Sequence, residues 1–392
     1  MRITIVGGHL SPALAVIENL PKDTEVLFIG RKYVFEGDKT LSLEYRTINK
    51  QKIPFAEIST GRWQRKFTRF TIASLFKIPY GFIQSFIILR KFKPDVFLGF
   101  GGYLSLPLGL AAFILRIPIV IHEQTLEAGI TNRILSIFAK KICISWETSF
   151  KYFPKDKTVF TGNPIRKFSL SSRLKWRDLS QQTLLKEIPR QARNDTPVIY
   201  ITGGSSGSHF INTLVEGCIR QLLEKFNVFH QTGDAQKYHD FDRLQNFRES
   251  LPFALKARYA ITKFVEPENI GSVIKVADLV VSRAGINTIT ELIFFKKPSL
   301  LIPIPFSQRN EQVKNALFLK SLGLAEVFYQ DALDSKKFLR FIEEMFNNKS
   351  RYKILNRSMK QVQDMVQDDK KSAAKKIIEV LEYAKKNNKK PE

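Results

Sequence analysis

Short apolar runs alternate with segments of helical spacing along most of the chain. The apolar runs lie at residues 2–6, 24–29, 95–100, 118–121, 140–144, 158–160, 198–202, 259–265, 277–281 and 300–303, and residues 228–233 are predicted to be a further strand with its turn. Such runs are typical of strands that are buried on both faces. Between them, residues 105–115, 129–139 and 311–322 have the apolar spacing of helices. Strands that alternate with helices predict the α/β class, with doubly wound parallel sheets.

A glycine-containing turn follows the first strand of each half of the chain. Gly7-Gly8-His9 follows residues 2–6, and Gly203–Ser208 follows residues 198–202. Doubly wound sheets bind ligands at the carboxyl ends of their strands, and the helix that begins there offers N–H groups to phosphate. A lone histidine is more often structural, but its place in a glycine turn at a strand end makes His9 a candidate for chemistry. The second turn matches neither the P-loop nor the G-x-G-x-x-G pattern.

The segment Ser282–Glu291 has two interpretations. It follows a buried strand and precedes apolar residues of helical spacing, so we predict a helix that begins near Asn287 or Thr288. Glu291 stands three residues after Thr288, the spacing of a capping box, so it could simply close the helix start. Alternatively, its carboxylate accepts two sugar hydroxyls while the helix N-terminus binds a phosphate.

The chain of 392 residues suits two domains. Residues 170–195 are polar and without periodicity, which is typical of a linker or an exposed insertion. We expect a Rossmann-like domain at 1–163, the linker or insertion at 164–197, a second Rossmann-like domain at 198–355, and a helical tail at 356–392 that packs back toward the first domain.

The composition indicates which classes of binding partner the protein is expected to have. A formal net charge of +25 favours a polyanionic partner, either nucleic acid, an anionic membrane surface or phosphorylated substrates. The two cysteines, Cys143 and Cys218, lack CxxC spacing, which argues against a disulfide framework or a zinc site. No apolar run reaches the roughly 20 residues that a membrane-spanning helix needs.

Basic and large apolar residues are mixed over Arg62–Lys93. This mixture suits a helix on a membrane surface, and it also suits a core helix with a solvated basic face. Pro79 and Gly81 predict that the segment is broken into two helices. Polar residues His122–Thr125 follow the strand at 118–121, which makes them further site candidates.

An ordered set of short motifs resembles the MurG family of peptidoglycan N-acetylglucosaminyltransferases, from about residue 1 to residue 325. Any one of the motifs is weak, but their order and spacing are specific. They are Gly7-Gly8-His9 with Pro12-Ala13-Leu14-Ala15, His122-Glu123-Gln124 with Gly129–Arg133, Gly162–Arg166, Gly203-Gly204-Ser205, Gln231-Thr232-Gly233, Arg283-Ala284-Gly285 with Thr288 and Glu291, and Gln312 with Asn315-Ala316.

The resemblance implies the GT-B architecture of two Rossmann-like domains. It implies an inverting transfer of N-acetylglucosamine (GlcNAc) from UDP-GlcNAc to the muramyl 4-hydroxyl of lipid I, which gives lipid II. The acceptor is a polyprenyl-diphosphate-linked sugar, so the first domain would bind the acceptor and the anionic membrane surface through the Arg62–Lys93 region. The enzyme would be peripheral, on the cytoplasmic face of the cell membrane. No metal and no cofactor are implied.

The resemblance also implies roles for particular residues. His9 would be the catalytic base. The other positions would bind substrate: Arg166 and Ser205 the diphosphate, Val265 the uracil through its backbone, Ile286, Asn287 and Thr288 the region of the phosphates, Glu291 the ribose hydroxyls, Gln312 the GlcNAc hydroxyls, and Thr125 a position where the family commonly has Asn.

This sequence departs from the family at its first glycine turn, where Val6 runs straight into Gly7 and extra Gly and Thr residues are absent. Alternatives therefore stay open. They are another GT-B transferase with a different lipid acceptor, a UDP-GlcNAc 2-epimerase, and an inactive relative that only binds UDP-sugar. Nucleic-acid binding ranks last, because the chain carries no recognised nucleic-acid motif.

Overall fold

The computed structural model describes residues 1–33, 41–61, 69–166, 196–204, 206–235, 237–355 and 372–388, with the backbone alone for residues 69–78 and 308. The described residues form two compact units. The first unit comprises residues 1–166 and 372–388, and the second comprises residues 196–355. Most of the expected linker, the expected tail before residue 372 and the start of the Arg62–Lys93 region lie outside the described residues.

The first unit contains a parallel sheet whose described strands have the order β3-β2-β1-β4-β5-β6-β7. The strands are β1 (Arg2–Val6), β2 (Glu25–Gly30), β3 (Phe55–Glu57), β4 (Val96–Gly99), β5 (Ile119–Glu123), β6 (Lys141–Ile144) and β7 (Thr158–Phe160). Its helices are α1 (Leu10–Ile17), α2 (Leu43–Lys50), α3 (Arg69–Phe92), α4 (Ser105–Ile114), α5 (Ile130–Phe138), the 3-10 helix η1 (Glu147–Tyr152) and α16 (Ala373–Lys386).

The second unit contains a parallel sheet whose described strands have the order β10-β9-β8-β11-β12-β13. The strands are β8 (Val198–Thr202), β9 (Asn227–Gln231), β10 (Tyr259–Thr262), β11 (Leu279–Ser282), β12 (Ser299–Leu301) and β13 (Ala325–Val327). Its helices are α7 (His209–Glu216), α8 (Ile219–Lys225), α9 (Asp240–Glu249), α10 (Phe253–Lys256), α11 (Ile270–Val276), α12 (Ile286–Phe294), α13 (Glu311–Ser321) and α14 (Ser335–Asn347), with 3-10 helices η3 (Gln308–Asn310), η4 (Gln330–Ala332) and η5 (Lys349–Arg351).

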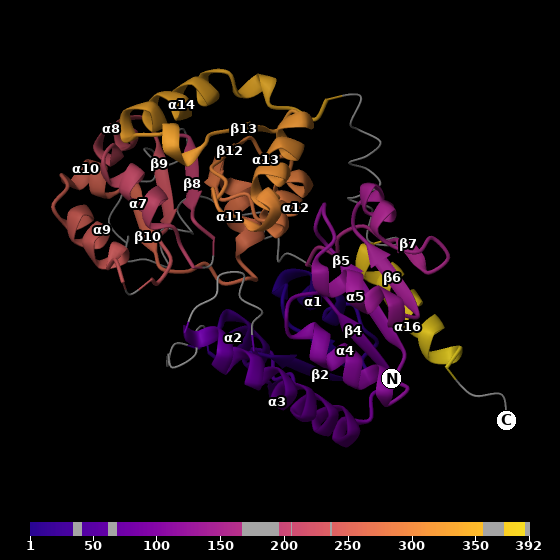
Figure 1. Cartoon of the computed structure of the whole chain (residues 1–392). Coiled ribbons are helices and arrows are strands. Elements are labelled where there is room, and N and C mark those ends of the chain that lie inside the picture. Colours follow the sequence, from indigo (N-terminus) through magenta and orange to yellow (C-terminus); the bar gives the residue numbers. More distant parts are fainter. Residues whose placement is uncertain are drawn as a thin grey trace. The chain divides into compact units, whose positions relative to one another are not determined.

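Each sheet is buried by helices on both faces, and the predicted doubly wound α/β class is confirmed. The apolar runs form continuous cores because their side chains point alternately to both faces. In the first unit, α16 packs on α1 and on β4, β5 and β6 (Figure 1). Its buried residues Ile377 and Leu381 join the core that contains Ile5 and Leu98.

The prediction that Pro79 and Gly81 break the 62–93 segment is wrong, because α3 runs without interruption from Arg69 to Phe92. Pro79 is exposed, so the helix accommodates its ring on the solvent side. Gly81 allows α3 to pack closely against Thr60, since a Cβ at this position would lie 2.4 Å from the Cβ of Thr60.

Candidate functional site

Two helices begin where the second sheet reverses its strand order. Helix α7 starts after the turn that follows β8, and α12 starts after the turn that follows β11. Thr202 pairs with Ser282 at the ends of these strands, so the two turns are neighbours. Each helix start offers backbone N–H groups and the positive end of a helix dipole. Together they form an edge that is suited to bind an anion, here called the anion-binding edge, at the switch point, where open α/β sheets bind ligands.

The start of α12 corrects the sequence analysis. The N-cap is Gly285, and α12 begins at Ile286 rather than near Asn287 or Thr288. Thr288 is thus the third residue of the helix and Glu291 the sixth, so they do not have the positions of a capping box. The capping interpretation of Glu291 is wrong. The N–H groups of Ile286, Asn287 and Thr288 lie in the first turn, where a helix has no internal partner for them.

Arg283 connects the two turns. Its guanidinium donates to Ser208 Oγ at 2.7 Å, to Gln330 Oε1 at 3.1 Å and to the carbonyl of Ile302 at 3.0 Å. Burial lowers the pKa of Arg283 to about 10, so it stays charged at neutral pH. Within the described residues it has no carboxylate partner. A cation beside the positive ends of two helices is unfavourable unless an anion binds there.

The glycines of this edge differ in what surrounds them. A Cβ added to Gly204 or Gly285 would have no described atom within 4 Å. A Cβ on Gly207 would lie 2.0 Å from the carbonyl oxygen of Thr232, in backbone that is already left-handed at φ +75°. Gly207 is therefore required by packing, whereas Gly204 and Gly285 leave space in front of the helix N-termini.

Glu291 lies near Tyr200 of β8. Burial raises the pKa of the Tyr200 phenol, and the charge of the Glu291 carboxylate raises it further. Around the same turn, three side-chain atoms are buried without a hydrogen-bond partner among the described residues: Ser282 Oγ, Asn287 Oδ1 and Asn315 Oδ1. Buried polar groups normally have partners, so unused capacity of this kind is typical of a site for a polar ligand or bound water.

Gln312 and Val265 are placed by neighbouring loops. The Oε1 of Gln312 accepts from the N–H of Ile304 at 3.1 Å, which leaves its amide Nε2 as the donor of this side chain. Val265 follows β10, and its backbone N–H and C=O make no hydrogen bond with the rest of the described chain. Ser205, a predicted diphosphate ligand, lies outside the described residues.

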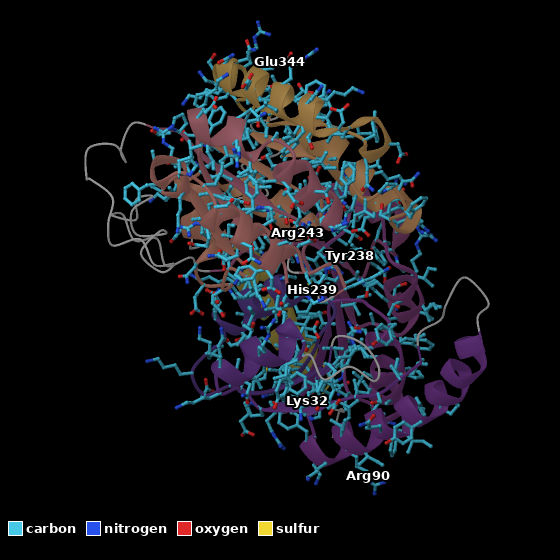
Figure 2. All side chains as sticks on the ribbon, turned by 90° about the vertical axis from the view of Figure 1, so that its left-hand side faces the viewer. Lys32, Arg90, Tyr238, His239, Arg243 and Glu344 are labelled. Atoms are coloured by element: carbon cyan, nitrogen blue, oxygen red, sulfur yellow. The ribbon has the colours of Figure 1, made fainter. Side chains whose placement is uncertain are left out.

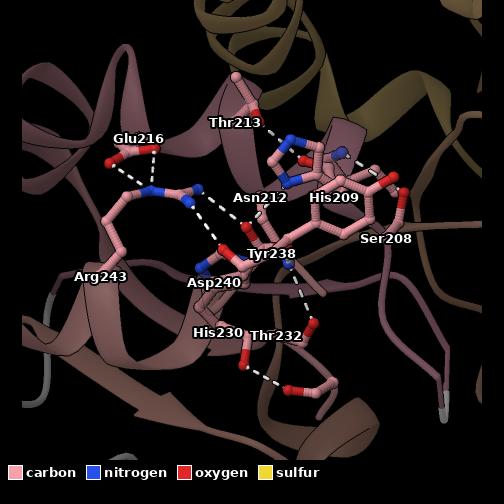
Figure 3. Close-up of polar contacts among 12 residues, drawn as sticks. Ser208, His209, Asn212, Thr213, Glu216, His230, Thr232, Tyr238, Asp240 and Arg243 are labelled. Carbon is pink, nitrogen blue, oxygen red and sulfur yellow. Dashed lines mark hydrogen bonds and ion pairs between the residues drawn. The ribbon is translucent and has the colours of Figure 1, made fainter. Parts of the chain in front are cut away.

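A buried polar network holds α7 in place (Figure 3). Asp240 accepts from His209 Nδ1, Asn212 Nδ2 and Arg243 Nη2, each at 2.8 Å. Because Asn212 also donates to the carbonyl of Thr232, its Oδ1 must accept from His230 Nε2 at 3.0 Å. Burial lowers the pKa of His230 to about 3, so the imidazole is neutral. The network fixes the helix whose N-terminus forms part of the anion-binding edge.

In the first unit, the turns after β1 and β4 meet at the corresponding switch point. Val6 pairs with Gly99, and a Cβ on Gly8 would lie 2.7 Å from the carbonyl oxygen of Gly101. His9 follows in extended backbone, and its ring makes no hydrogen bond with any described residue. Burial lowers the pKa of His9 to about 4, so its imidazole is neutral and able to accept a proton at pH 7.

Glu123 organises the neighbouring loop. Its buried carboxylate accepts from the N–H of Gly129 at 2.9 Å, from Asn132 Nδ2 at 3.0 Å and from the N–H of Thr125 at 3.0 Å. The hydroxyl of Thr125 lies within 2.5 Å of Glu123 Oε1 and of a backbone carbonyl. Thr125 therefore makes these hydrogen bonds within the loop that precedes α5. Arg166 is buried, six residues after β7.

The predicted residues are distributed over the two units. His9, Thr125 and Arg166 belong to the first unit, and Val265, Ile286, Asn287, Thr288, Glu291 and Gln312 belong to the second. Sequence reasoning did not assign a site role to Arg283 or to Glu44. Arg283 had a usable signal, an arginine directly before the turn that follows a buried strand. Glu44 had none, because only the order of the strands brings it to the Gly7–Gly8 turn.

Comparisons with known proteins agree with this geometry. The Glycosyltransferase family 28 N-terminal domain matches residues 6–144, and the Glycosyltransferase family 28 C-terminal domain matches residues 198–383. A relative from Clostridium kluyveri is 33% identical over 381 residues, 97% of this chain and 97% of its own. It is named UDP-N-acetylglucosamine--N-acetylmuramyl-(pentapeptide) pyrophosphoryl-undecaprenol N-acetylglucosamine transferase. The chain belongs to this transferase family. The predicted family and the glycosyltransferase class are thereby confirmed.

Solved structures extend the family comparison to the fold. MurG from Acinetobacter baumannii is 25% identical with a TM-score of 0.63, and the match covers 97% of this chain and 99% of that one. The UDP-GlcNAc 2-epimerase from Neisseria meningitidis has the same TM-score of 0.63 at 15% identity, covering 98% and 100%. This second likeness shows the fold alone, and the predicted GT-B architecture is confirmed.

Neither a metal-binding cluster nor a membrane-spanning helix occurs among the described residues. No group of three or more His, Cys, Asp or Glu side chains among them is arranged to hold a metal ion. Within the same part of the chain, every helix is too short or too polar to span a bilayer.

Proposed function

We propose that the chain transfers GlcNAc from UDP-GlcNAc to the muramyl 4-hydroxyl of undecaprenyl-diphosphate-linked MurNAc-pentapeptide, converting lipid I to lipid II. The observation that carries the proposal is the anion-binding edge of the second unit, in a chain of this transferase family. Two helix N-termini, an arginine without a carboxylate partner and two open glycine positions suit a nucleotide diphosphate.

On the donor side, the first-turn N–H groups of Ile286, Asn287 and Thr288 would bind phosphate oxygens, together with Ser205 and Arg166. The Glu291 carboxylate would accept the ribose hydroxyls, and the backbone of Val265 would bond the uracil. Because the Oε1 of Gln312 is already held by Ile304, its Nε2 would donate to a GlcNAc hydroxyl oxygen.

In the transfer step, the muramyl hydroxyl loses its proton to the His9 imidazole while its oxygen attacks C1 of GlcNAc. The bond from C1 to the diphosphate oxygen breaks, UDP leaves, and the anomeric configuration inverts. The reaction passes through an oxocarbenium-like state, so catalysis depends on stabilising the leaving diphosphate. Arginine and helix N-termini supply positive charge there, and we therefore expect no metal requirement.

The proposal is tested by transfer of labelled GlcNAc from UDP to a lipid I analogue in detergent, with EDTA present. Glu291→Ala is expected to raise the KM for UDP-GlcNAc by about 10–100-fold, because hydrogen bonds to a charged group contribute about 1.5–3 kcal/mol. Glu344→Ala is the control, since Glu344 is an exposed acid on α14 (Figure 2).

Lipid-linked product from the wild-type protein in EDTA would support the reaction and its independence of metal. Consumption of UDP-GlcNAc with formation of a 2-epimer and no lipid product would overturn the proposal in favour of an isomerase. Binding of UDP-GlcNAc without any turnover would identify an inactive relative.

We also propose that α3, α4 and α5 form the surface that binds the cytoplasmic face of the membrane. These helices are neighbours in the first unit, and each exposes large apolar side chains. The exposed residues are Tyr80, Ile83 and Ile87 on α3, Phe113 and Ile114 on α4, and Ile130, Ile134 and Ile137 on α5. The exposed cations Arg90, Lys91, Arg116 and Lys140 lie on or next to these helices. Apolar surface bordered by cations suits an anionic bilayer.

Ile83→Glu combined with Ile87→Glu is expected to weaken binding to phosphatidylglycerol-containing vesicles by at least about tenfold. Each large apolar side chain contributes about 1.5–3 kcal/mol when it is buried. Leu317→Glu, at an exposed apolar position of the second unit, is the matched control. Vesicle co-sedimentation measures the effect, and equal binding of all three proteins would show that α3 does not contact the membrane.

A further inference from the structure

Glu44 lies beside the turn that carries His9, although it follows Gly8 by 36 residues. It belongs to the first turn of α2, whose N-cap Ser42 accepts a hydrogen bond from the N–H of Tyr45 at 3.1 Å. From this fixed helix start, the carboxylate reaches the turn after β1, where Oε1 accepts from the N–H of Gly8 at 3.0 Å.

Two glycines leave room for this carboxylate. A Cβ on Gly7 would lie 2.9 Å from Glu44 Oε2, and a Cβ on Gly30 would lie 3.2 Å from the same atom. On the other side of the turn, a Cβ on Gly8 would lie 2.7 Å from the carbonyl oxygen of Gly101. The turn is thus enclosed between Glu44 and Gly101, and its conformation determines where the following residue, His9, places its ring.

If Glu44 only stabilised α2, its contact with the Gly7–Gly8 turn would be left unexplained. An acidic residue in the first turn of a helix is favourable for the helix dipole alone. That role does not require contact with another segment. Here the carboxylate accepts a hydrogen bond from the Gly8 N–H on a different segment, and burial raises the pKa of Glu44 while the Gly8 N–H and Arg31 act to lower it.

We propose that Glu44 is a positioning residue for the acceptor side of the transfer reaction, acting through the Gly8 N–H on the turn that carries His9. The proposal rests on the proposed function, in which His9 accepts the proton of the muramyl hydroxyl. Because the His9 ring makes no hydrogen bond with any described residue, its position depends on the backbone that Glu44 holds.

The kinetic test compares Glu44→Ala with Glu44→Gln, which keeps an oxygen that can accept from the Gly8 N–H. A misplacement of about 1 Å at a reacting group can lower the rate about 10²-fold. We expect Glu44→Ala to lower kcat by about 10–10²-fold with an unchanged KM for UDP-GlcNAc, and Glu44→Gln to restore most of the loss. Glu25→Ala, an exposed acid of the same unit, is the control.

A second readout does not depend on activity. Hydrogen exchange of the Gly8 amide, measured by NMR, is expected to accelerate in Glu44→Ala and to stay near the wild-type rate in Glu44→Gln. If the wild-type protein transfers no sugar, the proposed function fails while the exchange data still test the contact. Unchanged exchange and unchanged kcat in Glu44→Ala would overturn the inference. Equal loss of kcat in both variants with a protected Gly8 amide would also overturn it, because the charge and not the hydrogen bond would then matter.

Discussion

We expect His9→Ala to lower kcat for GlcNAc transfer by about 10²–10⁴-fold, the usual contribution of a general base, and to leave the affinity for UDP unchanged. The reason is the place of His9 at the carboxyl end of β1, with a ring that no described residue hydrogen-bonds. We expect UDP binding to be unaffected because His9 is not part of the anion-binding edge, which belongs to the second unit. Steady-state kinetics with a lipid I analogue and calorimetry with UDP measure the two quantities.

The pH dependence gives an independent check on the same residue. A base must be unprotonated, and the pKa of His9 is lowered to about 4, so the unprotonated fraction falls only as the pH approaches 4. As far as His9 is concerned, kcat/KM is expected to be constant from pH 8 down to about pH 5. His9→Gln serves as a control that keeps a polar side chain without a basic nitrogen. An acid limb near pH 6.5 would contradict burial of the imidazole, and full activity of His9→Ala would assign the base elsewhere.

We expect Gly285→Ala to lower UDP affinity by about tenfold or more while it changes the free energy of unfolding by less than about 1 kcal/mol. The backbone of Gly285 has φ −67° and ψ 143°, which any residue adopts, and an added Cβ meets no described atom within 4 Å. The fold therefore tolerates alanine. A methyl group at this N-cap would instead stand where a phosphate oxygen approaches the first N–H groups of α12.

The matched variant is Gly207→Ala in the turn before α7. Its Cβ would lie 2.0 Å from the carbonyl oxygen of Thr232, and its φ of +75° is left-handed. We expect a loss of about 2–5 kcal/mol of stability from backbone strain and overpacking. Chemical denaturation and UDP calorimetry separate the two cases. Wild-type UDP affinity in Gly285→Ala would exclude the N-terminus of α12 as the phosphate site.

The sequence predicted most strand positions correctly because a buried parallel strand leaves a local mark, a short apolar run bounded by turn residues. It missed two short strands at sheet edges, β3 and β13. Helix boundaries were less certain. Gly285 begins α12 without any side-chain cap among the described residues, whereas Asn287 and Thr288 have the side chains that usually cap. A glycine N-cap leaves no mark that distinguishes it from an ordinary turn. Similarly, the continuity of α3 through Pro79 depends on which side of the helix faces solvent.

What the sequence determined by itself is the doubly wound class, the glycine turns at the strand ends and the family to which the chain belongs. These features depend on residues that are close together in the sequence or on motifs that follow one another in a fixed order. Only the tertiary structure decided how the side chains of the site meet. Arg283 binds Ser208 across 75 residues and Glu44 binds Gly8 across 36. Contacts of this kind depend on which strands lie next to each other, because parallel neighbours bring distant turns to one edge of a sheet.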